Sequence, residues 1–100
     1  MPTKEEIMEA LKEVYDPELG MNVVELGLIY DVTVEDEGRK VKVLMTLTVP
    51  GCPLAQMITE YVGRRIHQME GVEDVDVELT FDPPWSPERM SPEARERLGL

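Results

Sequence analysis

The sequence predicts an α+β protein, a two-layer sandwich in the order α-β-β-α-β, with a three-stranded mixed sheet and helices on one face. Two segments, near residues 28–35 and 40–49, alternate apolar and polar residues as half-buried strands do. A helical apolar stripe starts at residue 53, and a third alternating segment follows at 74–82. The crossover through that helix returns the third strand parallel to the second, so we expect a mixed sheet.

The first helix is predicted over residues 4–15. Thr3 and Glu6 have the spacing of a capping box, in which each residue satisfies a backbone amide of the other. Apolar residues then recur at helical intervals, at Ile7, Leu11 and Val14. Asp16-Pro17 ends the pattern, because a proline ring cannot continue a helix.

Residues 28–49 are predicted to form an antiparallel hairpin that reverses at Glu37-Gly38-Arg39. The apolar positions are Leu28, Tyr30, Val32 and Val34 in the first strand, and Val41, Val43, Met45, Leu47 and Val49 in the second. Thr46 and Thr48 fall on the opposite face of the second strand. We expect that face, which also carries Asp31, Asp76 and Glu78, to be partly solvated.

The second helix starts at Pro53, and Gly71 lies just past its end. Its apolar stripe consists of Leu54, Ile58, Tyr61, Val62, Ile66 and Met69. The third strand places its apolar residues at Val75, Val77, Leu79 and Phe81. We expect the core to form where Ile7, Leu11, Tyr61 and Ile66 pack on Val43, Met45, Val77 and Leu79.

Residues 1–100 are interpreted as a single domain whose last part, 82–100, is a proline-rich arm and a short helix. The prolines of Asp82-Pro83-Pro84-Trp85-Ser86-Pro87 require an extended or turning backbone. Ser91 as cap, followed by Pro92 inside the first turn, predicts a short helix up to Leu98.

The charge balance limits the partners that we expect. The chain has 21 acidic and 10 basic residues, a formal net charge of −11, which repels the phosphates of nucleic acid. No apolar run approaches the ~18 residues that span a bilayer, so we expect no membrane segment. The first residues lack the apolar core of a signal peptide, which predicts a cytoplasmic protein. An acidic surface suits partners with basic patches, although it also serves solubility alone.

Cys52, the only cysteine, is the strongest candidate for chemistry. It stands between the second strand and the second helix, where free amides and the positive helix end stabilise a thiolate. The negative net charge acts in the opposite direction and raises the pKa of the thiol. A small buried cap residue is the alternative interpretation. His67, the only histidine, lies fifteen residues further along. This spacing corresponds to roughly 22 Å at ~1.5 Å per residue, too far for a metal shared with Cys52.

Four other residues are candidates near this cysteine or at a partner surface. Asp16 either caps its local turn or acts beside Cys52. Glu18 and Glu25 are carboxylates of the same loop region, and their spacing does not make them an acid/base pair. Trp85 either covers the edge of the core or anchors a partner, because tryptophan is enriched in binding hot spots.

Four separated motifs follow one another along the chain: Asp16-Pro17-Glu18-Leu19-Gly20, Val24-Glu25-Leu26-Gly27-Leu28-Ile29-Tyr30, Met45-Thr46-Leu47-Thr48 leading to Gly51-Cys52-Pro53, and Asp82-Pro83-Pro84-Trp85. In this order they closely resemble the DUF-fifty-nine family of iron-sulfur cluster assembly factors, which includes SufT-like and PaaD-like bacterial proteins. The resemblance covers the chain from about Lys4 to Leu98. The resemblance implies a non-enzymatic role in maturing iron-sulfur proteins. Cys52 would match the family's reactive cysteine, and Asp16, Thr46 and Thr48 would match positions near it.

By this resemblance the partners would be iron-sulfur carriers and client apoproteins, and the cargo a transient iron-sulfur cluster held by Cys52. One cysteine cannot supply all the thiolates that such a cluster takes. The cluster would then be bridged between two subunits of a homodimer, or completed by small thiols or by a client. Alternatively, the domain only docks a client and a carrier, or serves as an adaptor in assembling one oxygenase complex. A thiol enzyme with Cys52 as nucleophile is a further alternative, but the sequence offers it no neighbouring histidine or resolving cysteine.

Overall fold

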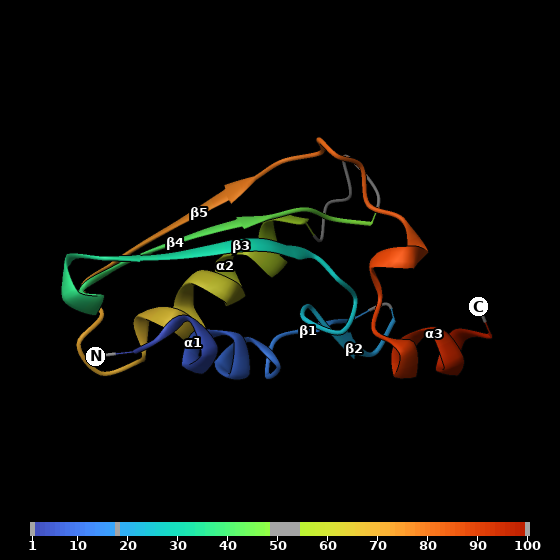
Figure 1. Ribbon diagram of the computed structural model, residues 1–100, viewed down its shortest axis with the longest axis horizontal. Helices are drawn as coiled ribbons and strands as arrows, with labels where there is room; N and C mark the ends of the chain where they lie inside the picture. Colours follow the sequence, from blue (N-terminus) through green and yellow to red (C-terminus); the bar gives the residue numbers. More distant parts are fainter. Residues whose placement is uncertain (1, 18, 49–54, 100) are drawn as a thin grey trace.

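A three-stranded mixed sheet, in the order β3-β4-β5, carries two helices on one face (Figure 1). The computed structural model describes residues 2–17, 19–48 and 55–99. Its elements are α1 (Lys4–Leu11), β1 (Tyr15–Asp16), β2 (Met21–Asn22), β3 (Ile29–Glu35), η1 (Asp36–Gly38), β4 (Lys40–Met45), α2 (Ala55–His67), β5 (Asp74–Leu79), η2 (Pro87–Arg89) and α3 (Pro92–Leu98). The predicted α+β class and element order are confirmed, with one addition, the small hairpin β1-β2.

Helix α1 begins as predicted and ends earlier. Thr3 and Glu6 form the complete capping box, each side chain accepting a hydrogen bond from the other's backbone amide. The helix ends at Leu11 and not at residue 15, because Tyr15 and Asp16 pair with Asn22 and Met21 in the β1-β2 hairpin. Residues 12–14 form the turn between helix and hairpin.

The sheet has the predicted mixed topology. Strands β3 and β4 are antiparallel, with Val32 opposite Val43, and β4 and β5 are parallel, with Val43 opposite Val77. The register of β3 shifts between Ile29 and Asp31, where one extra residue is inserted. Strand β5 ends at Leu79, before the predicted end at 82, because the amide of Thr80 makes the last hydrogen bond to β4, 2.8 Å from the Met45 carbonyl.

The core fills the space between the sheet and the helices. Its fully buried side chains include Ile7 and Leu11 of α1, Val62 and Ile66 of α2, and Val41, Val43 and Met45 of β4. Two of the expected core residues are exposed, Tyr61 by 41% and Leu79 by 39%. Tyr61 lies at the margin of the α2 stripe, where it lines a groove with Tyr15, and Leu79 ends an edge strand. Within the described residues, no helix is long and apolar enough to cross a membrane.

The C-terminal arm, residues 82–98, folds back onto the loop between β2 and β3 (Figure 1). Its closing helix α3 has the predicted caps. The Ser91 side chain accepts a hydrogen bond from the Ala94 amide, Pro92 stands in the first turn, and Gly99 ends the helix at a φ of 73°. The 3-10 turn η2 precedes it and was not predicted.

Candidate functional site

The predicted site follows the end of β4 in the sequence, in the segment between β4 and α2. Cys52, with the rest of 49–54, lies outside the described residues, and so does Glu18. The neighbouring chain is described up to Thr48 and again from Ala55. The described side chains that flank this segment in the sequence include Thr46 and Thr48.

Thr46 comes directly after β4 and is completely buried, with an exposed fraction of 0%. The expectation that it lies on a partly solvated sheet face is wrong. Its amide donates to the Leu28 carbonyl at 2.8 Å. The amide of Thr80, the residue after β5, donates to the carbonyl of Met45, the residue before Thr46. The backbone at Met45 and Thr46 is thus hydrogen-bonded to the residue before β3 on one side and to the residue after β5 on the other. Thr48, two residues further on, is half-buried.

The hydroxyl of Thr46 has no hydrogen-bond partner within the described part of the chain. A buried polar group without a partner is rare in native proteins, since leaving it unsatisfied costs about 1–3 kcal/mol. Such a group is expected where a site holds a polar or anionic group for part of its working cycle. Thr46 is thus the described residue with the clearest chemical signal beside the segment that holds Cys52.

We expect Thr46→Val to raise the free energy of unfolding by about 1 kcal/mol, because valine keeps the shape and removes the unsatisfied hydroxyl. Thr33→Val is the matched control, since Thr33 is exposed on β3 and its replacement should change stability by less than about 0.5 kcal/mol. Urea unfolding of both variants measures the difference. A clear loss of stability in Thr46→Val would show that the hydroxyl is satisfied in the folded protein.

Asp16 is buried, with 7% exposure, and lies in the hairpin β1-β2. Its Oδ1 accepts a hydrogen bond from the Leu19 amide at 3.3 Å, and its carbonyl accepts one from Gly20 at 2.8 Å. These contacts agree with the interpretation of Asp16 as the cap of its local turn. Gly20 completes the turn with a φ of 68°, a conformation that favours glycine.

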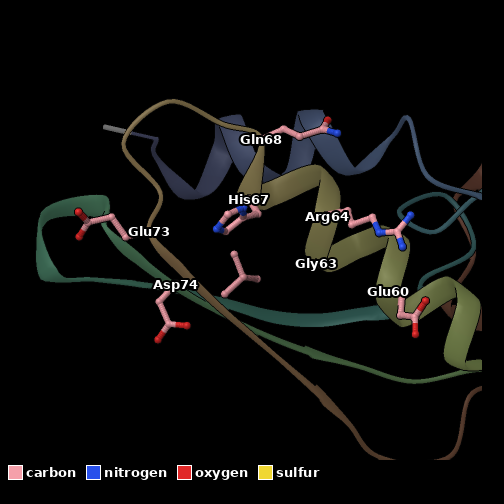
Figure 2. Close-up of a pocket in the computed structure, with 8 residues that line it drawn as sticks. Glu60, Gly63, Arg64, His67, Gln68, Glu73 and Asp74 are labelled. Atoms are coloured by element: carbon pink, nitrogen blue, oxygen red, sulfur yellow. The ribbon is translucent and has the colours of Figure 1, made fainter.

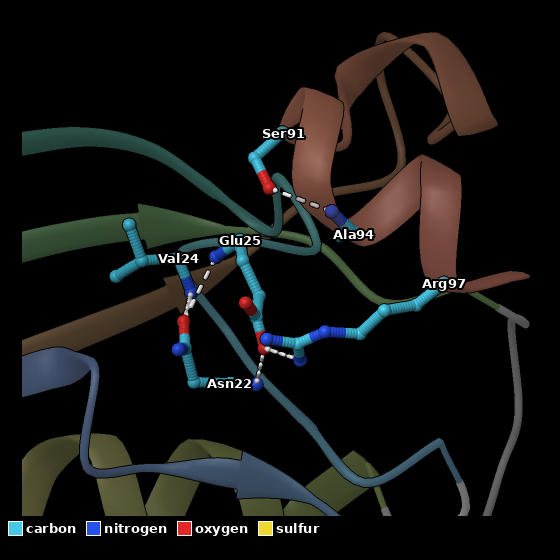
Figure 3. A network of polar contacts seen from close by, with 6 residues as sticks. All are labelled: Asn22, Val24, Glu25, Ser91, Ala94 and Arg97. Carbon is cyan, nitrogen blue, oxygen red and sulfur yellow. Dashed lines mark hydrogen bonds and ion pairs between the residues drawn. The ribbon is translucent and has the colours of Figure 1, made fainter.

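Glu25 belongs to a compact polar network with Asn22 (Figure 3). The Asn22 Oδ1 accepts hydrogen bonds from the amides of Val24 at 3.0 Å and Glu25 at 2.8 Å. In return, Oε1 of Glu25 accepts one from the Asn22 amide at 2.9 Å. Arg97 of α3 lies 3.6 Å from the same oxygen, and the Glu25 side chain is only 18% exposed. Glu25 therefore stabilises this loop and ties it to the C-terminal arm.

Further contacts bind the arm to the same loop. The Ser91 amide donates to the Glu25 carbonyl at 2.8 Å. Nε1 of Trp85 donates to the Leu26 carbonyl at 2.6 Å, and its half-buried ring packs against the core. The hydrogen bond and the packing of Trp85 agree with its interpretation as a cover over the core edge.

Tyr30 connects the arm to the start of β3. Its hydroxyl donates to the Pro83 carbonyl at 2.8 Å, and the Arg89 guanidinium lies 4.5 Å from the centre of its ring. At Gly27, with a φ of 74°, the backbone of Arg89 approaches so closely that a Cβ atom would overlap its carbonyl. The arm is thus held by several independent contacts along its length.

The structure brings part of the predicted set together. Glu25 and Trp85 meet at the contact between arm and loop, and Thr46 is hydrogen-bonded to the end of that loop at Leu28. Asp16 lies on the separate hairpin before the loop. Sequence reasoning missed the roles of Asn22, Tyr30 and Arg97. The spacing Asn22-x-x-Glu25 is a capping pattern, and it could have revealed the first of them.

His67 lies far from this end, in an open cleft of about 570 Å³ between α2 and β5 (Figure 2). The cleft is lined by Glu60, Gly63, Arg64, His67, Gln68, Glu73, Asp74 and Val75. Among the described residues, no group of three or more His, Cys, Asp or Glu side chains is placed to hold a metal ion.

Comparison with known proteins shows the family to which the chain belongs. The family model described as iron-sulfur cluster assembly protein matches residues 4–79. A Porphyromonas gingivalis protein named Fe-S protein maturation auxiliary factor is 46% identical over 100 residues, covering 100% of this chain and 94% of that protein. The Fe-S protein maturation auxiliary factor YitW of Bacillus subtilis is 43% identical over 97 residues, covering 97% and 94%.

A solved structure is also similar. The crystal structure described as domain of unknown function DUF59 from Bacillus anthracis superposes with a TM-score of 0.90 at 40% sequence identity. The match covers 97% of this chain and 92% of that one.

Proposed function

Because the chain belongs to the iron-sulfur cluster assembly protein family, we propose that it acts in the maturation of iron-sulfur proteins through the thiol of Cys52. Relatives of nearly the same length that are named auxiliary maturation factors support a non-enzymatic role of this kind. The cluster is then cargo that the protein receives and passes on.

The unsatisfied hydroxyl of Thr46 is the observation that supports this proposal most directly. A thiolate is the soft ligand that iron-sulfur clusters prefer, and their chemistry is tuned by hydrogen bonds to the sulfur atoms. A buried hydroxyl at the carboxyl end of β4, six residues before Cys52, is available as such a donor. Asp16, Glu18 and Thr48 are proposed to shape the same region, whereas Glu25 of the loop between β2 and β3 and Trp85 of the arm are proposed to support it by holding loop and arm together.

One thiolate leaves most of a cluster's coordination to other molecules. We therefore propose a short-lived complex in which a second subunit, small thiols or the client apoprotein supplies the remaining ligands. Incomplete coordination makes transfer easy, because the client needs to displace few bonds.

Anaerobic reconstitution with iron and sulfide tests the proposal. We expect the wild type to develop a sulfide-to-iron charge-transfer band when a small thiol is present, and Cys52→Ser to lose at least about nine tenths of it. Urea unfolding of both proteins is the control for the fold. A band of equal intensity in Cys52→Ser would contradict the proposal, and a wild type without a band would favour docking of clients without cluster binding.

A further inference from the structure

Strand β5 forms one edge of the sheet and is hydrogen-bonded on one side only. The amides of Asp74 and Thr80 donate toward β4, at 3.0 Å to the Arg39 carbonyl and 2.8 Å to the Met45 carbonyl. Because the direction of backbone groups alternates along a strand, the residues in between, Val75, Val77 and Leu79, direct their amides and carbonyls away from β4. Within the described ranges, no other residue is hydrogen-bonded to these outward groups.

The side chains of β5 alternate between carboxylates and apolar groups. Asp74, Asp76 and Glu78 are exposed, and none of them forms an ion pair with a described residue. Lys42, the neighbour of Asp76 on β4, pairs with Glu35 instead, at 3.8 Å. Lys40 and Lys42 of β4 stand beside Asp74 and Asp76 in the register, so they offset part of this charge without forming ion pairs with it. The edge therefore combines unpaired backbone groups with a row of three exposed carboxylates.

On the side of the helices, the edge of β5 borders the cleft that contains His67 (Figure 2). Val75 and Gly63 line it, with Asp74 and Glu73 at one end and Glu60 further along α2. A strand added to β5 would point every second side chain into this cleft and the others toward the row of carboxylates. The cleft leaves room for apolar side chains of moderate size.

A second copy of this chain is a poor occupant of the edge. If two copies paired antiparallel through β5 with their helices on the same side, Asp76 would stand opposite Asp76 of the other copy, and Asp74 opposite Glu78. Like charges directly opposite each other are destabilising, and each chain already carries a net charge of −11. The edge thus disfavours pairing with itself while it remains open to a cationic strand.

We propose that the outer edge of β5 binds an extended basic segment of a partner protein as a fourth strand. Its backbone would pair with Val75, Val77 and Leu79, its alternate Lys or Arg side chains would face Asp74, Asp76 and Glu78, and its apolar side chains would enter the cleft. The inference rests on the proposed function only in assigning this segment to a client or carrier. The binding itself involves neither Cys52 nor iron.

The test uses the full-length, ¹⁵N-labelled protein without iron and a capped hexapeptide of alternating lysine and valine. We expect chemical-shift changes at β5 and the cleft, with slower amide exchange at Val75, Val77 and Leu79. The same peptide with glutamate in place of lysine should bind at least about tenfold more weakly, because it meets the carboxylates of β5. Equal binding of the two peptides, or shifts confined to another surface, would overturn the proposal.

A protein variant separates backbone pairing from charge. Val77→Pro removes one outward amide without removing a hydrogen bond to β4, and proline is tolerated at such edge positions. Val77→Ala keeps the amide and loses similar side-chain contact, so it is the matched control. We expect binding of the lysine peptide to fall at least tenfold in Val77→Pro and less than about threefold in Val77→Ala.

Sedimentation velocity without peptide completes the test, and a monomer that binds the lysine peptide would support the proposal. Self-association abolished by Val77→Pro would assign the edge to a second copy and overturn the proposal. Because no iron is present in these experiments, either result leaves the reconstitution test of Cys52 unaffected.

Discussion

Gly27→Ala should lower the free energy of unfolding by about 3 kcal/mol. Two effects add at this position. An alanine at a φ of 74° costs about 1 kcal/mol, and its Cβ would overlap the Arg89 backbone and push the arm away from the loop. Urea unfolding measures the loss. If the arm separates from the loop, Trp85 becomes more exposed, and an added quencher in solution should reduce its fluorescence more strongly than in the wild type.

Gly20→Ala is the matched control for this prediction. Gly20 has a similar φ of 68°, but nothing lies within 4 Å of the position that its Cβ would take. Its replacement should cost only the conformational term, about 1 kcal/mol. If the two alanine variants unfolded at the same urea concentration, the close contact between Gly27 and the arm would contribute nothing.

Trp85→Ala should destabilise the protein by about 3 kcal/mol, near the lower end for tryptophan because the ring is only half-buried. It removes the ring from the core edge and the hydrogen bond to the Leu26 carbonyl. Trp85→Phe keeps a six-membered aromatic ring at the core edge and loses the indole donor with its smaller ring, so we expect a loss of about 1 kcal/mol. Thermal or urea unfolding of the pair measures both terms.

The same variants decide between the two interpretations of Trp85. If it covers the core, Trp85→Phe should transfer a cluster to a client apoprotein at the wild-type level. Trp85→Ala should then lose transfer only in proportion to the fraction of the protein that is unfolded. A folded Trp85→Ala protein of wild-type stability that fails to transfer would show instead that the residue anchors a partner.

Much of the fold followed from local patterns. The capping box at Thr3, the alternation in β3 and β4, and the caps of α3 each involve residues close in sequence, so the sequence alone indicates them. The parallel return of β5 followed from the handedness of crossover connections.

What the sequence left open depends on residues far apart in the chain. The hairpin β1-β2 is too short for a periodic pattern, and its formation shortened α1. The burial of Thr46 depends on Leu28 and on the segment after β5, so the alternation of the predicted strand 40–49 wrongly indicated a partly solvated position. The attachment of Tyr30 to Pro83 and of Arg97 to Glu25 likewise needs the arm to be in place.

The arm also determines what could be joined to this domain. The chain enters near one end of its 41 Å long axis, where α1 begins, and α3 lies near the other, on the side where β4 ends at Met45 (Figure 1). A protein fused after α3 would emerge at the end of the domain where β4 finishes, at a high effective concentration there, whereas one fused before α1 would start across the length of the domain. The order of the domains would therefore matter in a chain that joins this domain to another. Under the proposed function, a domain that accepts the iron-sulfur cluster would be better placed after α3 than before α1.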